Sequence, residues 1–335
     1  MKRLIIVFLL ISILVGGAFA QVSFSGEVHA GIQLERLYGS DETITADSRE
    51  KNAPFFDFAV TVMREDYGAR LDTTFQATDD PAGAGHFTLN GIFGWVNFWD
   101  NQIRLTMGRI SDAAWVANID ADLRELQLDD ITGFRVEYQT PLPGLSVGMA
   151  VPTDGHDFEG TMRRLIFGAN YIHPMFSAVF AYDLSSNVSS ILGFNFTGIP
   201  DLTAGFQLMA TNLASWDSDF FPGAIETHQK VGYRIMRPLD VHLILGQAFT
   251  SLADTDPFLE FTPGVSYRFL PNLTGTLRMT LDSDDLFETT NLTFRSTIEY
   301  ILRGPARFYV EYEMRLNNME RVDHRFGFGI EILAF

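Results

Sequence analysis

The stretch from Ser111 to Asp130 carries six carboxylates and a single base, Arg124. Concentrated carboxylates attract cations and arginines attract anions, so the balance between the two decides which ions approach. Arg70, Arg104 and Arg135, on nearby segments, are candidates to face the acidic stretch. We therefore expect a charged constriction, with an acidic loop on one side and a basic wall on the other. Its candidate acids are Asp112, Asp120, Asp122, Glu125, Asp129 and Asp130.

The same stretch has an apolar pattern of its own. Trp115, Ile119, Leu123 and Leu126 recur at spacings of four, four and three, which predicts a short amphipathic helix. An apolar stripe is more useful to a loop that packs on an inner wall than to one that projects into solvent. An acidic surface loop with one helical turn is the alternative.

Residues for catalysis or metal binding do not gather in the sequence. No H-E-x-x-H or H-x-x-E-H spacing, Gly-rich phosphate loop or G-x-S-x-G elbow occurs, and there is no cysteine. We expect no catalytic residues, no metal and no cofactor; an enzyme that assembles its site from distant strands stays an alternative. The histidines are His29, His86, His156, His173, His228, His242 and His324.

Apolar residues fall on every second position along most of the chain, as Ile103, Leu105 and Met107 do between polar neighbours. This period of two is typical of β-strands, and a length of about nine to twelve residues suits a tilted strand that crosses a membrane. The predicted strands are 22–34, 55–64, 68–78, 87–98, 102–110, 131–140, 144–152, 163–173, 175–184, 189–197, 202–211, 228–236, 239–249, 258–269, 273–282, 291–301, 306–316 and 324–335.

The connections between these strands alternate in kind. Tight turns built on Pro or Gly, such as Pro141 to Pro143, alternate with connections that are mostly longer and acidic, such as Glu35 to Pro54. The turns must then lie at one end of the strands and the loops at the other, as in outer-membrane barrels. The pattern predicts an all-β fold, a transmembrane antiparallel up-and-down β-barrel of about eighteen strands, in place of a β-sandwich.

Charged side chains share the polar face of the strands. A closed barrel of this width is too wide for side chains to fill, and dense charge needs water or partners, so this face is expected to line an aqueous lumen. The bases concerned are Arg70, Arg104, Arg135, Arg164, Lys230, Arg234, Arg268, Arg278, Arg295, Arg307 and Arg315.

The N-terminus and the composition bear on compartment and partners. Lys2 and Arg3, an apolar run and Ala18-Phe19-Ala20 predict a cleaved signal peptide over residues 1–20, followed by one barrel domain over 21–335. The formal net charge of the 335 residues is −18, which argues against nucleic acid as a partner.

Several segments resemble the general porins of Gram-negative outer membranes. Val22 to Ile32, with glycines at 26 and 31, is similar to the family's first strand. Phe98 to Arg109 is similar to the turn and strand before its constriction loop, and Gly133 to Leu145 is similar to the strand and turn after that loop. The chain ends in Phe335, as outer-membrane proteins commonly do.

The resemblance implies an inward-folded third external loop, Ser111 to Asp130. Family members usually have sixteen strands, so a barrel of sixteen strands is the alternative to one of eighteen. It also implies outer-membrane lipid, small hydrophilic solutes and ions, and the barrel-assembly machinery, which would recognise Phe335, as partners, with a possible homotrimer. The expected function is a passive diffusion channel with mild cation selectivity. The alternative is a non-conducting outer-membrane adhesin or structural surface protein.

Overall fold

The computed structural model describes residues 21–37, 43–47, 54–77, 85–111, 115–117, 126–127, 131–153, 164–184, 189–211, 224–249, 258–284, 289–303, 306–318 and 320–332. The signal-peptide prediction for residues 1–20 and the terminal Phe335 lie outside this part of the chain. No helix in the described residues is long and apolar enough to cross a membrane.

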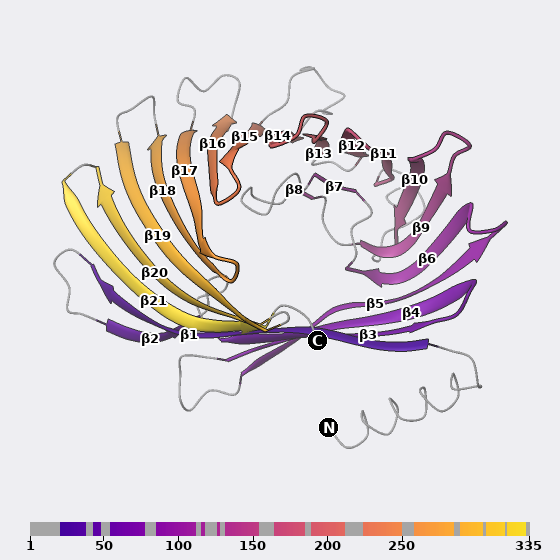
Figure 1. Ribbon diagram of the computed structural model, residues 1–335. Helices are drawn as coiled ribbons and strands as arrows, with labels where there is room; N and C mark the ends of the chain where they lie inside the picture. The colour runs from indigo at the N-terminus through magenta and orange to yellow at the C-terminus, as the bar shows by residue number, and fades with distance from the viewer. Residues whose placement is uncertain are drawn as a thin grey trace.

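The described chain is almost entirely β-structure (Figure 1). In chain order the strands are β1 (Gln21–Arg36), β2 (Thr43–Asp47), β3 (Phe55–Met63), β4 (Tyr67–Gln76), β5 (His86–Phe98), β6 (Ile103–Ile110), β7 (Val116–Ala117), β8 (Leu126–Gln127), β9 (Ile131–Gln139), β10 (Leu145–Pro152), β11 (Ile166–His173), β12 (Phe176–Asp183), β13 (Ser189–Phe196), β14 (Leu202–Thr211), β15 (Ala224–Met236), β16 (Leu239–Phe249), β17 (Phe258–Leu270), β18 (Leu273–Asp284), β19 (Thr289–Arg303), β20 (Ala306–Asn317) and β21 (Arg321–Ile332).

The sheet closes into a barrel. From β3 onward each wall strand pairs antiparallel with the next, and β1 pairs with β3 through residues 21–29 and with β21 through residues 28–36. Within the described residues this makes eighteen wall strands, which confirms the predicted barrel and excludes the sixteen-strand alternative. The short β2 is additional: it pairs with Gly31 to Glu35 of β1, beyond the end of β3.

The two ends of the barrel differ as predicted. Short turns such as Trp99 to Gln102 join strands at one end, and longer connections join them at the other. Because Val28 pairs with Ile332, β21 ends beside the first half of β1, at the end of the barrel that carries the short turns. Pairing between β20 and β21 is regular over the whole of Arg321–Ile332.

The outer surface of the barrel is apolar. Phe194 and Leu277 point outward and are exposed, whereas the intervening positions of the same strands, such as Arg278, point inward. Large apolar side chains are exposed on strands all round the barrel, which is unfavourable in water and favourable in lipid. The alternation in the sequence therefore specifies an outer face that suits lipid and an inner face that suits water.

Candidate functional site

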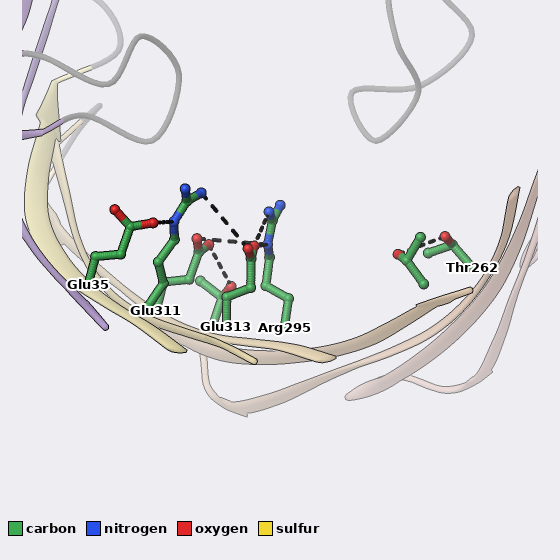
Figure 2. Close-up of polar contacts among 8 residues, drawn as sticks. Glu35, Thr262, Arg295, Glu311 and Glu313 are labelled. Atoms are coloured by element: carbon green, nitrogen blue, oxygen red, sulfur yellow. Dashed lines mark hydrogen bonds and ion pairs between the residues drawn. The ribbon is translucent and has the colours of Figure 1, made fainter. Parts of the chain in front are cut away.

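A row of alternating charges crosses the inner wall on four adjacent strands. The register places Glu35 of β1 beside Arg325 of β21, then Glu313 of β20, then Arg295 of β19. Arg325 Nε donates to Glu35 Oε1 at 2.8 Å, and Arg295 Nε donates to Glu313 Oε2 at 2.9 Å. Figure 2 shows Glu35, Glu311, Glu313 and Arg295 on one side of the sheet. We call Glu35, Arg325, Glu313, Arg295 and Glu311 the charged belt.

A second group of residues lies where β1 meets β21. It consists of Arg307, Glu331, His29, Glu27 and Phe55, and we call it the closure cluster. Arg307 of β20 donates to Glu331 of β21, whose side chain is only 1% exposed. His29 of β1 is also buried: its ring lies 3.3 Å from Glu27 and 3.6 Å from Glu331, and it stacks on Phe55 at a centroid distance of 4.3 Å. The cluster joins β1, β3, β20 and β21 at the seam that closes the barrel.

Arg70, Arg104 and Arg135 all lie on the inner face, on β4, β6 and β9, as the sequence predicts. Arg70 contacts Asp72 at 2.8 Å, and Arg135 contacts Glu137 at 3.1 Å.

These arginines differ in their access to the lumen. Arg104 donates to Asn97 at 3.2 Å and lies over the ring of Trp95, 5.2 Å from its centroid. The side chain of Arg70 is 40% exposed, whereas Arg135 is only 5% exposed. Arg70 is therefore more accessible from the lumen than Arg135.

The acidic half of the predicted constriction lies outside the described residues: Asp112, Asp120, Asp122, Glu125, Asp129 and Asp130. Parts of the same connection are described, and they lie inside the ring of strands (Figure 1). β7 contacts β12 and β13, and β8 contacts β14. The described part of the connection is thus folded inward, as predicted.

The predicted amphipathic helix is wrong where the connection is described. Val116 pairs with Gln127 and Ala117 with Leu126, so the two segments form a β-ladder. The apolar residues at both ends of the stripe contribute to a hairpin that packs on the wall, and this packing overrides a weak helical periodicity.

Sequence reasoning missed an apolar patch on the inner wall. Trp115 packs there with Ala150, Ile166, Ala181 and Ile191 from β10 to β13. The available signal was the scarcity of charge on the inward positions of these strands, which carry only Asp183, where the other half of the barrel has arginine and glutamate. In the described part of the chain, no three His, Asp or Glu side chains are grouped so that they could hold a metal ion.

Taken together, a closed antiparallel barrel with an apolar outside and a charged inside defines the class of porin-type β-barrels. Solved structures support this assignment of the fold. The outer membrane channel DcaP of Acinetobacter baumannii matches with a TM-score of 0.55 and 13% identity, over 96% of this chain and 99% of that one. OccAB3 of Acinetobacter baumannii matches with a TM-score of 0.63 and 11% identity, over 94% and 100%.

An anion-selective porin from Comamonas acidovorans has a TM-score of 0.51 and 13% identity, over 94% of this chain and all of that one. No protein-family model matches the sequence, and no curated protein sequence matches it. At these identities the likeness establishes the fold, and the porin-type barrel predicted from the sequence is confirmed.

Proposed function

We propose that this protein is an outer-membrane porin, a passive diffusion channel for small hydrophilic solutes and ions. The observation that carries the proposal is the inner wall: arginine and glutamate side chains, such as those of the charged belt, line a barrel whose outside is apolar. Charges at this density are costly unless water reaches them. Size exclusion and the local field then select solutes, and no reaction is catalysed.

The same proposal includes the partners expected from the sequence. Outer-membrane lipid would contact the apolar face, and the barrel-assembly machinery would act on the C-terminal Phe335. A homotrimer is a further possibility of this proposal. DcaP, one of the structural neighbours, is itself an outer membrane channel, which supports this location. A non-conducting adhesin or structural surface protein is the alternative, and it would share the fold but pass no ions.

Modest cation selectivity is the finer part of the proposal. Asp and Glu outnumber Lys and Arg by 42 to 24 in the whole chain, and the Ser111 to Asp130 connection is strongly acidic. On the barrel wall, Arg70 and Arg135 each contact a neighbouring carboxylate, which weakens their attraction for anions. The unbalanced acids of the connection should therefore dominate the field at the narrowest section.

Planar-bilayer recording of the refolded protein tests both parts. We expect stepwise ion currents and, in a salt gradient, a reversal potential of the sign that indicates cation selectivity. The selectivity should weaken as the salt concentration rises, because the Debye length falls from about 30 Å at 0.01 M to about 3 Å at 1 M. Asp120→Asn, Asp122→Asn and Glu125→Gln together should move the reversal potential toward anions. Arg70→Gln with Arg104→Gln should move it the other way.

A matched control removes three acids at the opposite end of the barrel. Glu65, Asp66 and Asp100 are exposed in short turns, so neutralising all three should shift the reversal potential much less than the acidic-connection triple. Absence of current from the folded wild-type barrel would favour the adhesin alternative. An equal shift in the two acid triples would show that the Ser111 to Asp130 connection does not control selectivity.

A further inference from the structure

Trp115 is an unusual side chain for the lumen of a charged barrel. It is 6% exposed, although it belongs to a connection that carries six acids among its twenty residues. Its burial comes from the barrel wall, because it packs with Ala150, Ile166, Ala181 and Ile191 of β10 to β13. A large indole removed from water in this way favours the position in which the wall covers it.

Two glycines make room for the indole. Gly148 of β10 and Gly168 of β11 are paired across the sheet and face inward. A Cβ atom on Gly168 would overlap the indole ring of Trp115, and a Cβ on Gly148 would lie 2.9 Å from Cζ2 of the same ring. The indole thus occupies a hollow in the wall that exists only because both positions lack a side chain.

Few other described contacts hold this part of the connection. The β7–β8 ladder has two residue pairs, and its strands contact β12, β13 and β14. Near the start of the connection, Ser111 Oγ donates to Asp72 Oδ2 at 2.7 Å, which fixes the chain at β4. Trp115 is the buried aromatic anchor between that fixed point and the hairpin.

We propose that Trp115, seated on Gly148 and Gly168, is the positioning residue that holds the β7–β8 hairpin against the β10–β14 wall and so keeps the channel open and of constant width. The inference rests on the proposed channel function, because it assigns the hairpin a fixed place beside the ion path. Without the anchor the β7–β8 hairpin is free to leave the wall and enter the lumen.

The test uses the refolded full-length chain with Trp115→Ala and, separately, Gly168→Ala. Gly168→Ala keeps Trp115 in the sequence but adds a methyl group where the indole ring lies. It therefore tests the space that the glycine leaves in the wall rather than the indole itself. The matched control is Gly327→Ala: Gly327 also faces inward, but a Cβ there would have its nearest neighbour 3.9 Å away. Heat-modifiable mobility on a gel confirms that each variant forms a barrel.

Two measurements are made on each variant. In single-channel recording, Trp115→Ala and Gly168→Ala should show frequent partial closures that the wild type and Gly327→Ala lack. In hydrogen–deuterium exchange, the amides of β7 and β8 should exchange faster in the same two variants while the wall strands keep their protection. The double variant should behave like either single one, because both changes remove one contact.

The exchange measurement separates this inference from the proposed function. A folded wild-type barrel that passes no current would contradict the channel, while faster exchange in β7 and β8 would still support the anchor. Steady currents together with unchanged exchange in both Trp115→Ala and Gly168→Ala would overturn it. Equal effects in Gly168→Ala and Gly327→Ala would also overturn it, since they would reflect a general response to added methyl groups.

Discussion

Replacing Arg307 with leucine is expected to lower the free energy of unfolding by about 3 to 5 kcal/mol, the range for breaking a buried ion pair. The reason is its partner: the carboxylate of Glu331 is 1% exposed and would lose the guanidinium that donates to it in the closure cluster. The broken pair joins β20 to β21, at the position where Glu331 also pairs with His29 of β1 and the barrel closes. Urea unfolding of the barrel in lipid vesicles, followed by tryptophan fluorescence, measures the loss.

Arg325→Leu is the matched control for this prediction. Arg325 also bridges carboxylates on neighbouring strands, but its side chain is 47% exposed, and Glu313, which it would leave behind, keeps its bond to Arg295. The expected loss is about 0 to 1 kcal/mol. Combining Arg307→Leu with Glu331→Leu should recover part of the loss, because the buried carboxylate that had lost its partner is then removed as well. Equal losses in Arg307→Leu and Arg325→Leu would show that burial of Glu331 does not matter.

The strands and their faces could be predicted from the sequence because they depend on local information. Alternation with a period of two defines each strand and which face each residue occupies, and Pro or Gly defines the turns. Leu277 and Arg278 illustrate this: adjacent in the chain, they point to opposite sides as the alternation requires. The alternation alone therefore predicts the eighteen strands of the barrel wall, without any information on how they pair.

The partners of the charges could not be predicted in the same way. Alternation places Arg295 and Glu313 on the inner face, but only the register between β19 and β20 brings them into contact. Likewise, nothing near Arg307 in the sequence identifies Glu331, twenty-four residues away, as its partner. Contacts between strands depend on stagger, which a single strand's sequence does not contain.

The connection from Ser111 to Asp130 shows a second limit. Apolar residues at helical spacing predicted a helix, yet Val116 and Ala117 pair with Gln127 and Leu126. The feature that decides the outcome is distant in sequence: Gly148 and Gly168 provide the seat for Trp115. The short β2 was missed for a similar reason, since its five residues become a strand only by pairing with β1.

The last prediction concerns the face toward lipid. Leu277→Arg is expected to lower the free energy of unfolding by about 2 to 4 kcal/mol, which is the cost of placing an arginine on the lipid face near the middle of the hydrocarbon layer. Leu277 lies well inside β18, points outward and is 51% exposed on the apolar surface. The guanidinium there would lose its hydration and find no carboxylate among the outward apolar side chains. Urea unfolding of the barrel refolded into vesicles measures the loss.

Thr276→Arg is the control, because it introduces the same side chain one residue earlier on the opposite face. Thr276 points inward and hydrogen-bonds Ser266 at 3.0 Å. The register continues this row of inward residues to Asp240 on one side and, through Thr297, to Glu311 on the other. An arginine at this position meets water and carboxylates, so the loss should be about 1 kcal/mol or less, as for exposed ion pairs. If both variants unfolded at the same urea concentration, the outer face would not be in lipid, and the membrane-spanning barrel would have to be abandoned.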